Sequence, residues 1–100
     1  MAFVYALTNS NNTVLYIGAT SNIKKRIYMH KKSLIREFTQ RYNVHKLVHC
    51  EYYATMDLAR NRETQLKKAL RKKKVDLINE SNPAWAEINL ADVDCASIGD

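Results

Sequence analysis

The chain has few of the residues that mark secreted, membrane-spanning or zinc-binding proteins. Its 100 residues include two cysteines, two glycines and one proline. No apolar run approaches the ~20 residues that a membrane-spanning helix needs, and residues 1–5 lack the basic start of a signal peptide. Cys50 and Cys95 have no partners at zinc-ligand spacing, which favours two free thiols. We therefore expect a cytoplasmic, intracellular protein with no membrane contact and no zinc site.

Several common catalytic patterns are also missing. The sequence has no glycine-rich phosphate loop, no serine nucleophile elbow and no closely spaced pair of carboxylates. Its three histidines are scattered along the chain at His30, His45 and His49. These absences exclude the most readily recognised classes of nucleotide-binding, serine-hydrolase and zinc enzymes.

Basic residues dominate the body of the chain. All sixteen Lys and Arg lie between Lys24 and Lys74, a span with only four acidic residues. Residues 1–90 hold sixteen basic and seven acidic side chains, a formal charge of +9, whereas the last ten residues carry three aspartates and no base. A body of this charge suits the phosphate backbone of nucleic acid, although a need for solubility explains it equally well.

The length predicts one domain, because 100 residues leave room for a single modest core. Hydrophobic patterning predicts its strands and helices. Residues 3–7 and 13–18 read as two strands joined by the turn formers of 8–12. A helix over about 23–34, a strand over 46–53 and a helix over about 55–70 follow. The basic run 71–74 is expected to link this helix to a short last one, which stops at Asn82-Pro83.

This order of elements predicts an α+β domain over residues 1–90. Its core is expected to be a small antiparallel three-stranded β-sheet flanked by α-helices. Residues 91–100 are expected to form an acidic, frayed tail.

Two tyrosines are expected to stand side by side in the hairpin. If the loop over 8–12 is symmetric, Tyr5 lies directly opposite Tyr16, with Cβ atoms ~5 Å apart on one sheet face. Gly18, the only glycine of the body, ends the second strand. Glycine at such a position permits a positive φ or the close approach of another group, and a plain strand-end turn is the simpler alternative.

Three polar residues, two arginines and a histidine, are predicted to lie where polar groups are costly. Arg26 and His30 lie one turn apart at the core-facing side of the first helix, where unpaired polar groups are unfavourable. A guanidinium there suits a phosphate, but a snorkelling arginine and a satisfied core histidine are the simpler interpretation. Arg62 projects into the apolar face of the later helix, which is unusual unless it is paired or reaches a ligand.

Glu63 is an acid within a strongly basic segment. Mg²⁺ often takes only one or two protein carboxylates, together with water and phosphate oxygens, so a single glutamate could hold it. The alternative is an ion pair with Lys67 one helical turn away, worth only ~0.3–0.5 kcal/mol.

Taken together, these residues resemble the GIY-YIG nuclease domain, most closely its small stand-alone members. The likeness runs from Val4 to about Leu90. It rests on residues 3–5 and 16–18, the helix with Arg26 and His30, the Arg62-Glu63 segment and the closing Asn82-Pro83-Ala84-Trp85. The sequence departs from the family pattern at Phe3, Glu37 and Ala69, where relatives often have glycine, glycine and tryptophan.

The resemblance implies a metal-dependent endonuclease that hydrolyses phosphodiester bonds in nucleic acid, with structured DNA favoured over RNA. It implies one Mg²⁺ or Mn²⁺ ion held by Glu63. The implied catalytic residues are Tyr5, Tyr16, Arg26, His30, Glu63 and Asn82, with Gly18 in a structural role.

Each implied residue has an expected role in the resemblance. Tyr5 would activate or orient the attacking water and Tyr16 would position it. Arg26 would stabilise charge on the phosphate, His30 would hydrogen-bond a tyrosine or the phosphate, and Asn82 would brace the site. An ordinary phenol with a pKa near ~10 is a poor base, so neighbouring cations would have to lower it.

Contacts to nucleic acid are expected from Lys24, Lys25, Lys31, Arg62, Lys67 and Arg71. A protein partner could supply specificity, because domains of this kind are normally joined to DNA-binding domains. Two alternatives stay open: a nucleic-acid-binding module with little or no cleavage, and an assembly protein whose basic face meets an acidic partner. DNA repair is one of several pathways that the sequence fits.

Overall fold

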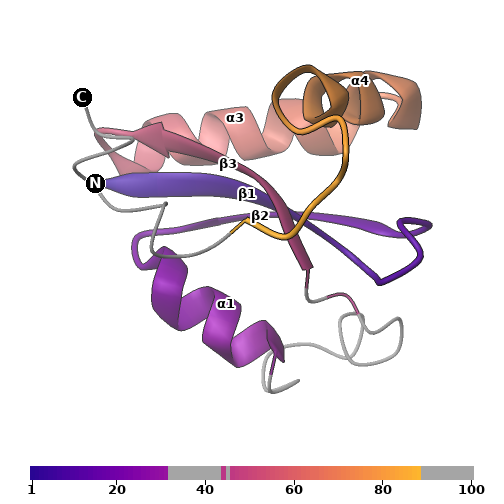
Figure 1. Cartoon of the computed structure of the whole chain (residues 1–100). Helices are drawn as coiled ribbons and strands as arrows, with labels where there is room; N and C mark the ends of the chain where they lie inside the picture. Colours follow the sequence, from indigo (N-terminus) through magenta and orange to yellow (C-terminus); the bar gives the residue numbers. More distant parts are fainter. Residues whose placement is uncertain (32–43, 45, 89–100) are drawn as a thin grey trace.

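A three-stranded antiparallel sheet lies between helices on its two faces (Figure 1). The structure is a computed structural model that describes residues 1–31, 44 and 46–88, without the side chains of 29–31. Its elements are β1 (Ala2–Thr8), β2 (Leu15–Thr20), α1 (Ile23–Lys31), β3 (Lys46–Tyr53), α3 (Met56–Lys68) and α4 (Arg71–Ser81). The predicted α+β class and the small antiparallel three-stranded sheet flanked by helices are confirmed.

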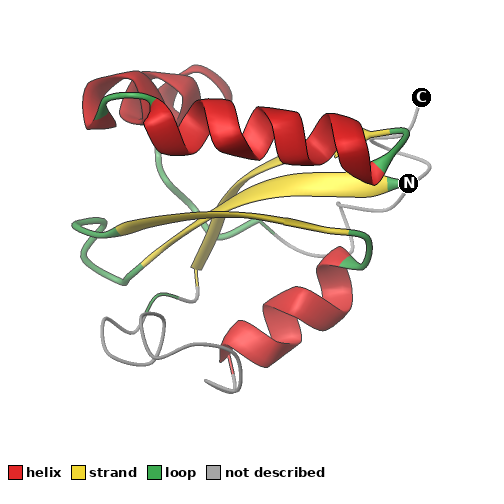
Figure 2. Ribbon diagram, turned by 180° about the vertical axis from the view of Figure 1, so that it is seen from behind, coloured by secondary structure: helices red, strands yellow, loops and turns green. Residues whose placement is uncertain are grey.

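The central strand β1 divides the core into two halves, in the strand order β2-β1-β3. Side chains alternate along a strand, so the odd-numbered residues 3–7 point to one face and Val4 and Ala6 to the other. The helix α1 covers the first face through Ile23 and Ile27, and α3 and α4 cover the second (Figures 1 and 2). Every residue of β1 is buried, which explains its nearly continuous apolar sequence.

The register of the hairpin differs from the prediction. Tyr5 pairs with Gly18, and Tyr16 pairs with Leu7. The prediction that Tyr5 lies directly opposite Tyr16 is therefore wrong by two residues. Because side chains alternate with a period of two, an even displacement leaves Tyr16 on the same sheet face as Tyr5.

Asn9 explains this displacement. Its side-chain Oδ1 accepts hydrogen bonds from the backbone N–H groups of Thr13 at 2.8 Å and Val14 at 3.2 Å. In addition, the Thr8 hydroxyl donates to the Val14 carbonyl at 2.7 Å. These bonds keep Thr13 and Val14 in the loop, so the second strand begins at Leu15 and the loop is longer than the sequence pattern suggested. The strand continues to Thr20, so the prediction that Gly18 ends it is wrong.

The helix α1 begins where the sequence predicted. The Asn22 side chain caps it by accepting a hydrogen bond from the Lys25 N–H at 3.1 Å. The predicted end near Leu34 lies outside the described residues, as do His45 and the tail over 91–100. Within the described chain, no helix is long and apolar enough to cross a membrane.

The later elements agree with the prediction except for one junction. Strand β3 has the predicted bounds, and Thr55 caps α3 by accepting from the Leu58 N–H at 3.3 Å. The basic run 71–74 was expected to be a link but forms the first turn of α4. Ala69 and Leu70 adopt extended conformations and suffice to join the two helices, and Lys and Arg favour helix.

Candidate active site

Tyr5 and Tyr16 form an aromatic pair on the sheet face covered by α1. Their ring centroids are 6.3 Å apart and their planes are inclined by 36°. The side chain of Tyr5 is 1% exposed, whereas that of Tyr16 is half-buried. The two phenols are therefore diagonal neighbours, with Tyr5 beneath the surface and Tyr16 nearer to solvent.

Gly18 makes room for Tyr5. A Cβ at this position would collide with the ring and the hydroxyl of the Tyr5 side chain, its cross-strand partner. No glycine in the described part of the chain has a positive φ. Of the roles that the sequence allowed, the structure thus assigns Gly18 the close approach of another group.

Arg26 reaches the same side of the sheet from α1. It precedes Ile27, which packs against the core beside Tyr5, and its side chain is half-buried. Among the described residues, its guanidinium makes no ion pair and no hydrogen bond. Five fixed donors are thus available for an anionic ligand. His30 lies one turn further along α1, and its side chain is outside the described part.

Glu63 comes from the other side of the sheet. It lies on α3, which packs over β1 and the edge strand β2. Its Oε2 is 2.9 Å from Nζ of Lys67, and the two side chains are 22% and 54% exposed. The expected alternative, an ion pair along the helix, is therefore present. Within residues 1–31, 44 and 46–88, no hydrogen bond or ion pair joins Glu63 to Tyr5 or Tyr16.

The donor chemistry of Glu63 fits a single divalent ion. The described residues contain no group of three or more His, Cys, Asp or Glu side chains that could hold a metal. Mg²⁺ nevertheless binds through one or two carboxylates when water and phosphate oxygens complete its shell. An exposed ion pair is worth only about 0.2–1 kcal/mol, so Lys67 leaves the Glu63 carboxylate available to a stronger ligand.

Asn82 follows α4 and contacts β3, whereas the tyrosine pair lies on β1 and β2. Its amide nitrogen donates to the carbonyls of Val48 at 3.1 Å and Ala86 at 2.8 Å. Its Oδ1 accepts from the Ala86 N–H at 3.2 Å. The side chain thereby joins the segment after α4 to β3, and its polar atoms are engaged by the backbone.

A charged network lies on the opposite face, centred on Glu51. Its carboxylate accepts from the Tyr53 hydroxyl at 2.7 Å and from Nε and Nη2 of Arg62 at 2.9 and 3.2 Å. Nε2 of His49 lies 2.8 Å from the same carboxylate. Burial alone would raise the pKa of Glu51, but hydrogen bonds from His49, Arg62 and Tyr53 outweigh it and lower the pKa to about 2.

This Glu51 network explains why Arg62 projects into an apolar helix face. The sequence pointed to a pairing or a ligand, but it did not identify Glu51, His49 and Tyr53 as the neighbours. One signal could have found them: polar residues at 49, 51 and 53 alternate along β3, which places all three on one face. The nucleic-acid contact expected of Arg62 stays a prediction, and its guanidinium already donates to Glu51.

Tyr53 of this network and the neighbouring Cys50 are poorly suited to catalysis. Burial, followed by the hydrogen bond to Glu51, raises the pKa of Tyr53 to about 12. Burial, followed by the charge of Glu51, raises the pKa of the Cys50 thiol to about 12. Cys50 is a free cysteine, as expected, and Cys95 lies outside the described residues. Neither Tyr53 nor Cys50 is a good base or nucleophile at neutral pH.

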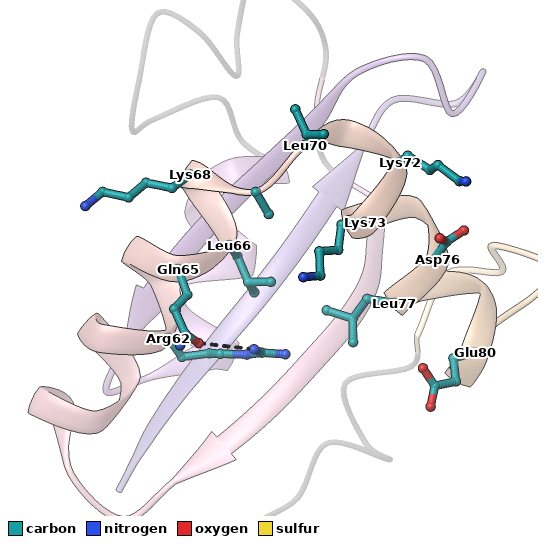
Figure 3. Close-up of a pocket in the computed structure, with 11 residues that line it drawn as sticks. Arg62, Gln65, Leu66, Lys68, Leu70, Lys72, Lys73, Asp76, Leu77 and Glu80 are labelled. Carbon is teal, nitrogen blue, oxygen red and sulfur yellow. Dashed lines mark hydrogen bonds between the residues drawn. The ribbon is translucent and has the colours of Figure 1, made fainter.

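A groove of about 1030 Å³ separates α3 from α4 (Figure 3). Leu66 and Leu77 are among its apolar lining residues, and lysines of both helices line it. Asp76 and Glu80 of α4 line the same groove, as the close-up shows. Because acidic and basic side chains share this groove, it suits a phosphate backbone less well than an all-basic surface does.

The predicted nucleic-acid contacts fall on more than one surface. Lys24 and Lys25 are exposed on α1, and Lys67 and Arg71 are exposed on α3 and α4. The side chain of Lys31 lies outside the described part. These contacts stay predictions. Of the described residues, Lys24 and Lys25 share a helix with Arg26.

Comparison with known proteins places the chain in a family. The model of the GIY-YIG catalytic domain matches residues 1–76. No solved structure matches the chain.

Relatives of similar length support the same placement. A UPF0213 protein of Clostridium perfringens is 33% identical over 82 residues, which cover 82% of this chain and 87% of the relative. A UPF0213 protein of Syntrophus aciditrophicus is 36% identical over 80 residues, which cover 79% and 91%. One of Natronomonas pharaonis is 32% identical over 76 residues, which cover 76% and 88%. The chain belongs to the GIY-YIG catalytic domain family, a nuclease-type family.

Proposed function

We propose that this protein is a metal-dependent endonuclease that hydrolyses phosphodiester bonds, with structured DNA as the preferred substrate. The observation that carries the proposal is the Tyr5–Tyr16 pair, in which Tyr5 packs against Gly18. The pair lies on the sheet face covered by α1, the helix that carries Arg26. Phenols and a guanidinium on one face are suited to the attacking water and to the charge of a phosphate.

The two tyrosines are proposed to handle the attacking water. Tyr5 would activate or orient it and Tyr16 would position it. Because Tyr5 is 1% exposed, its hydroxyl would act on a water held inside the site rather than on bulk water.

Arg26 is proposed to bind the scissile phosphate. Its five donors have a fixed planar arrangement that matches phosphate oxygens. Donors placed in advance where negative charge develops lower the barrier to phosphoryl transfer. In the described chain no acid neutralises Arg26, so its charge is available to the substrate.

Glu63 is proposed to hold one Mg²⁺ or Mn²⁺ ion, which when bound supplies Lewis-acid activation of the phosphate and leaving oxygen. The edge strand β2 relates Glu63 to the tyrosines, because it carries Tyr16 and lies beneath α3. Groups from α1 and α3 could therefore act together on a phosphodiester bound at the β2 edge.

A second candidate function is a nucleic-acid-binding module with little cleavage. The ion pair between Glu63 and Lys67 favours it, because the same carboxylate already has a partner within its own helix. Both candidate functions need basic side chains that bind nucleic acid, so a binding measurement alone does not distinguish them.

A cleavage assay on the purified protein separates them. The substrates are labelled duplex, single-stranded, flapped and branched DNA, together with RNA, each with Mg²⁺, with Mn²⁺ or with chelator. Glu63→Gln removes the charge of the proposed metal ligand at nearly constant shape, and we expect it to lower the rate at least about 100-fold. Asp57→Asn, an exposed acid of the same helix, is the matched control and should cut like the wild type.

Metal-dependent cutting that Glu63→Gln abolishes, with binding retained, would establish the nuclease. Salt-sensitive binding without any cutting would establish the binding module in its place. Equal loss in Glu63→Gln and Asp57→Asn would show that helix charge matters rather than a metal ligand.

A further inference from the structure

Among the described hydrophobic side chains of α1, only that of Tyr28 is mostly exposed. Its exposed fraction is 58%, whereas Ile23 and Ile27 on the core side of the same helix are 3% and 1% exposed. An aromatic ring in this position contributes little to the core. A flat, exposed aromatic surface is well suited to stacking on a nucleic-acid base, because every base has a π-face.

Two exposed lysines flank Tyr28 on the helix surface. Lys24 and Lys25 precede it by four and three residues, which are the spacings that bring side chains together on one face of a helix. The sequence of α1 contains no acidic residue. The exposed surface formed by Lys24, Lys25 and Tyr28 therefore combines positive charge with an aromatic ring and has no competing carboxylate of its own helix.

The position of these lysines is not explained by helix stability. Both lie in the first turn of α1, where the helix dipole favours acids and disfavours cations by about 0.3–1 kcal/mol per charge. Local choices that oppose stability are expected at functional sites. Attraction of phosphate accounts for the position of the two lysines. The exposed ring of Tyr28 indicates that the ligand carries a base as well as phosphate.

We infer that this surface binds an unpaired nucleotide beside the candidate active site, with the base stacked on Tyr28 and the flanking phosphates held by Lys24 and Lys25. The inference rests on the proposed function and names its substrate class. Arg26 lies within the same helix, is half-buried, and is next in sequence to Ile27, which belongs to the same core cluster as Tyr5. One strand could therefore pass from the stacking surface to the proposed cleavage site.

The preferred substrate is accordingly nucleic acid with a single-stranded nucleotide next to the cleaved bond. In a continuous duplex both faces of each base are covered by neighbours, so a stacking residue gains a partner only if a base is extruded. Flapped, branched or single-stranded substrates offer that base without the cost of unpairing.

Binding measured in chelator tests the inference without any contribution from cleavage. The probes are a short single strand that contains 2-aminopurine and its blunt duplex. Tyr28→Ala should weaken binding of the single strand about 5- to 150-fold and abolish quenching of the fluorescent base. Tyr28→Phe should retain both, and neither variant should change binding of the duplex. Leu58→Ala, which removes a 50% exposed apolar side chain of α3, is the matched control and should bind like the wild type.

The salt dependence separates stacking from charge. Replacing Lys24 and Lys25 together by glutamine should reduce the slope of log affinity against log salt by about 1.4 on single strands. Tyr28→Ala should lower affinity and leave that slope unchanged. Wild-type affinity in Tyr28→Ala, or an equal loss on the single strand and the duplex, would overturn the stacking surface.

These results are independent of the cleavage assay. If Tyr28 has no effect but Glu63-dependent cutting is observed, the stacking surface is wrong and the nuclease stands. If no substrate is cut but Tyr28 controls single-strand binding, the nuclease is wrong and the stacking surface stands.

Discussion

The two faces of the sheet carry the same kinds of polar group in opposite situations. On the face covered by α3 and α4, the phenol of Tyr53 and the guanidinium of Arg62 both donate to the carboxylate of Glu51. The phenols of Tyr5 and Tyr16 lie on the face covered by α1. Arg26 belongs to that helix, and no described acid pairs with it.

The difference lies in where the negative charge comes from. A half-buried guanidinium needs an anion, and on the α3–α4 side the chain provides one in Glu51. On the α1 side a phosphate could take the same place, which makes that face the candidate site. Phenols and arginines alone therefore do not mark a catalytic centre. Where an acid of the chain pairs with them they are framework that stabilises the fold, and where none does they are candidates for the active site.

The largest expected effect is on the framework side. Arg62→Ala should lower the free energy of unfolding by about 2–4 kcal/mol, because it leaves the Glu51 carboxylate short of two donors. Urea unfolding at neutral pH measures the change, and Arg60→Ala, an exposed arginine of the same helix, should stay within about 0.5 kcal/mol. Equal and small effects of the two variants would show that the network does not hold the fold.

The pH dependence of stability follows from the same carboxylate. The pKa of Glu51 is about 2 in the folded protein against an ordinary value of 4.5, so the folded state binds its proton less readily. Its contribution, about 3 kcal/mol, is therefore complete above pH 4.5 and is lost as the pH falls towards 2. Urea unfolding between pH 7 and pH 2 should show this loss, and Glu51→Gln should flatten that part of the profile. An unchanged profile in Glu51→Gln would contradict the assignment.

Gly18→Ala tests the packing of the candidate site. The added Cβ meets the Tyr5 ring, so we expect a loss of about 1–3 kcal/mol of unfolding free energy, as for other overpacked sites. In a Tyr5→Val background the obstacle is gone, and the cost of Gly18→Ala should largely disappear. The same cost in both backgrounds would mean that the glycine is needed for another reason.

Sequence patterns predicted the elements of both faces better than their contacts. Apolar periodicity and capping residues located the strands and helices, because those signals are local. The hairpin register depended on hydrogen bonds of the Asn9 side chain, which no periodicity reveals. The partner of Arg62 lies eleven residues away in the sequence, on a strand in a different layer. Only the fold brings the two together.

The most direct test removes one hydroxyl from each face. Tyr5→Phe and Tyr53→Phe delete the same atom, and their cleavage rates are compared on the substrate that the wild type cuts best, with unfolding followed in parallel. We predict at least an about 100-fold lower rate for Tyr5→Phe. For Tyr53→Phe we predict a nearly unchanged rate and a loss of about 1–3 kcal/mol of stability. A Tyr53→Phe variant that cannot cut, beside an active Tyr5→Phe, would contradict the assignment of site and framework to these two faces.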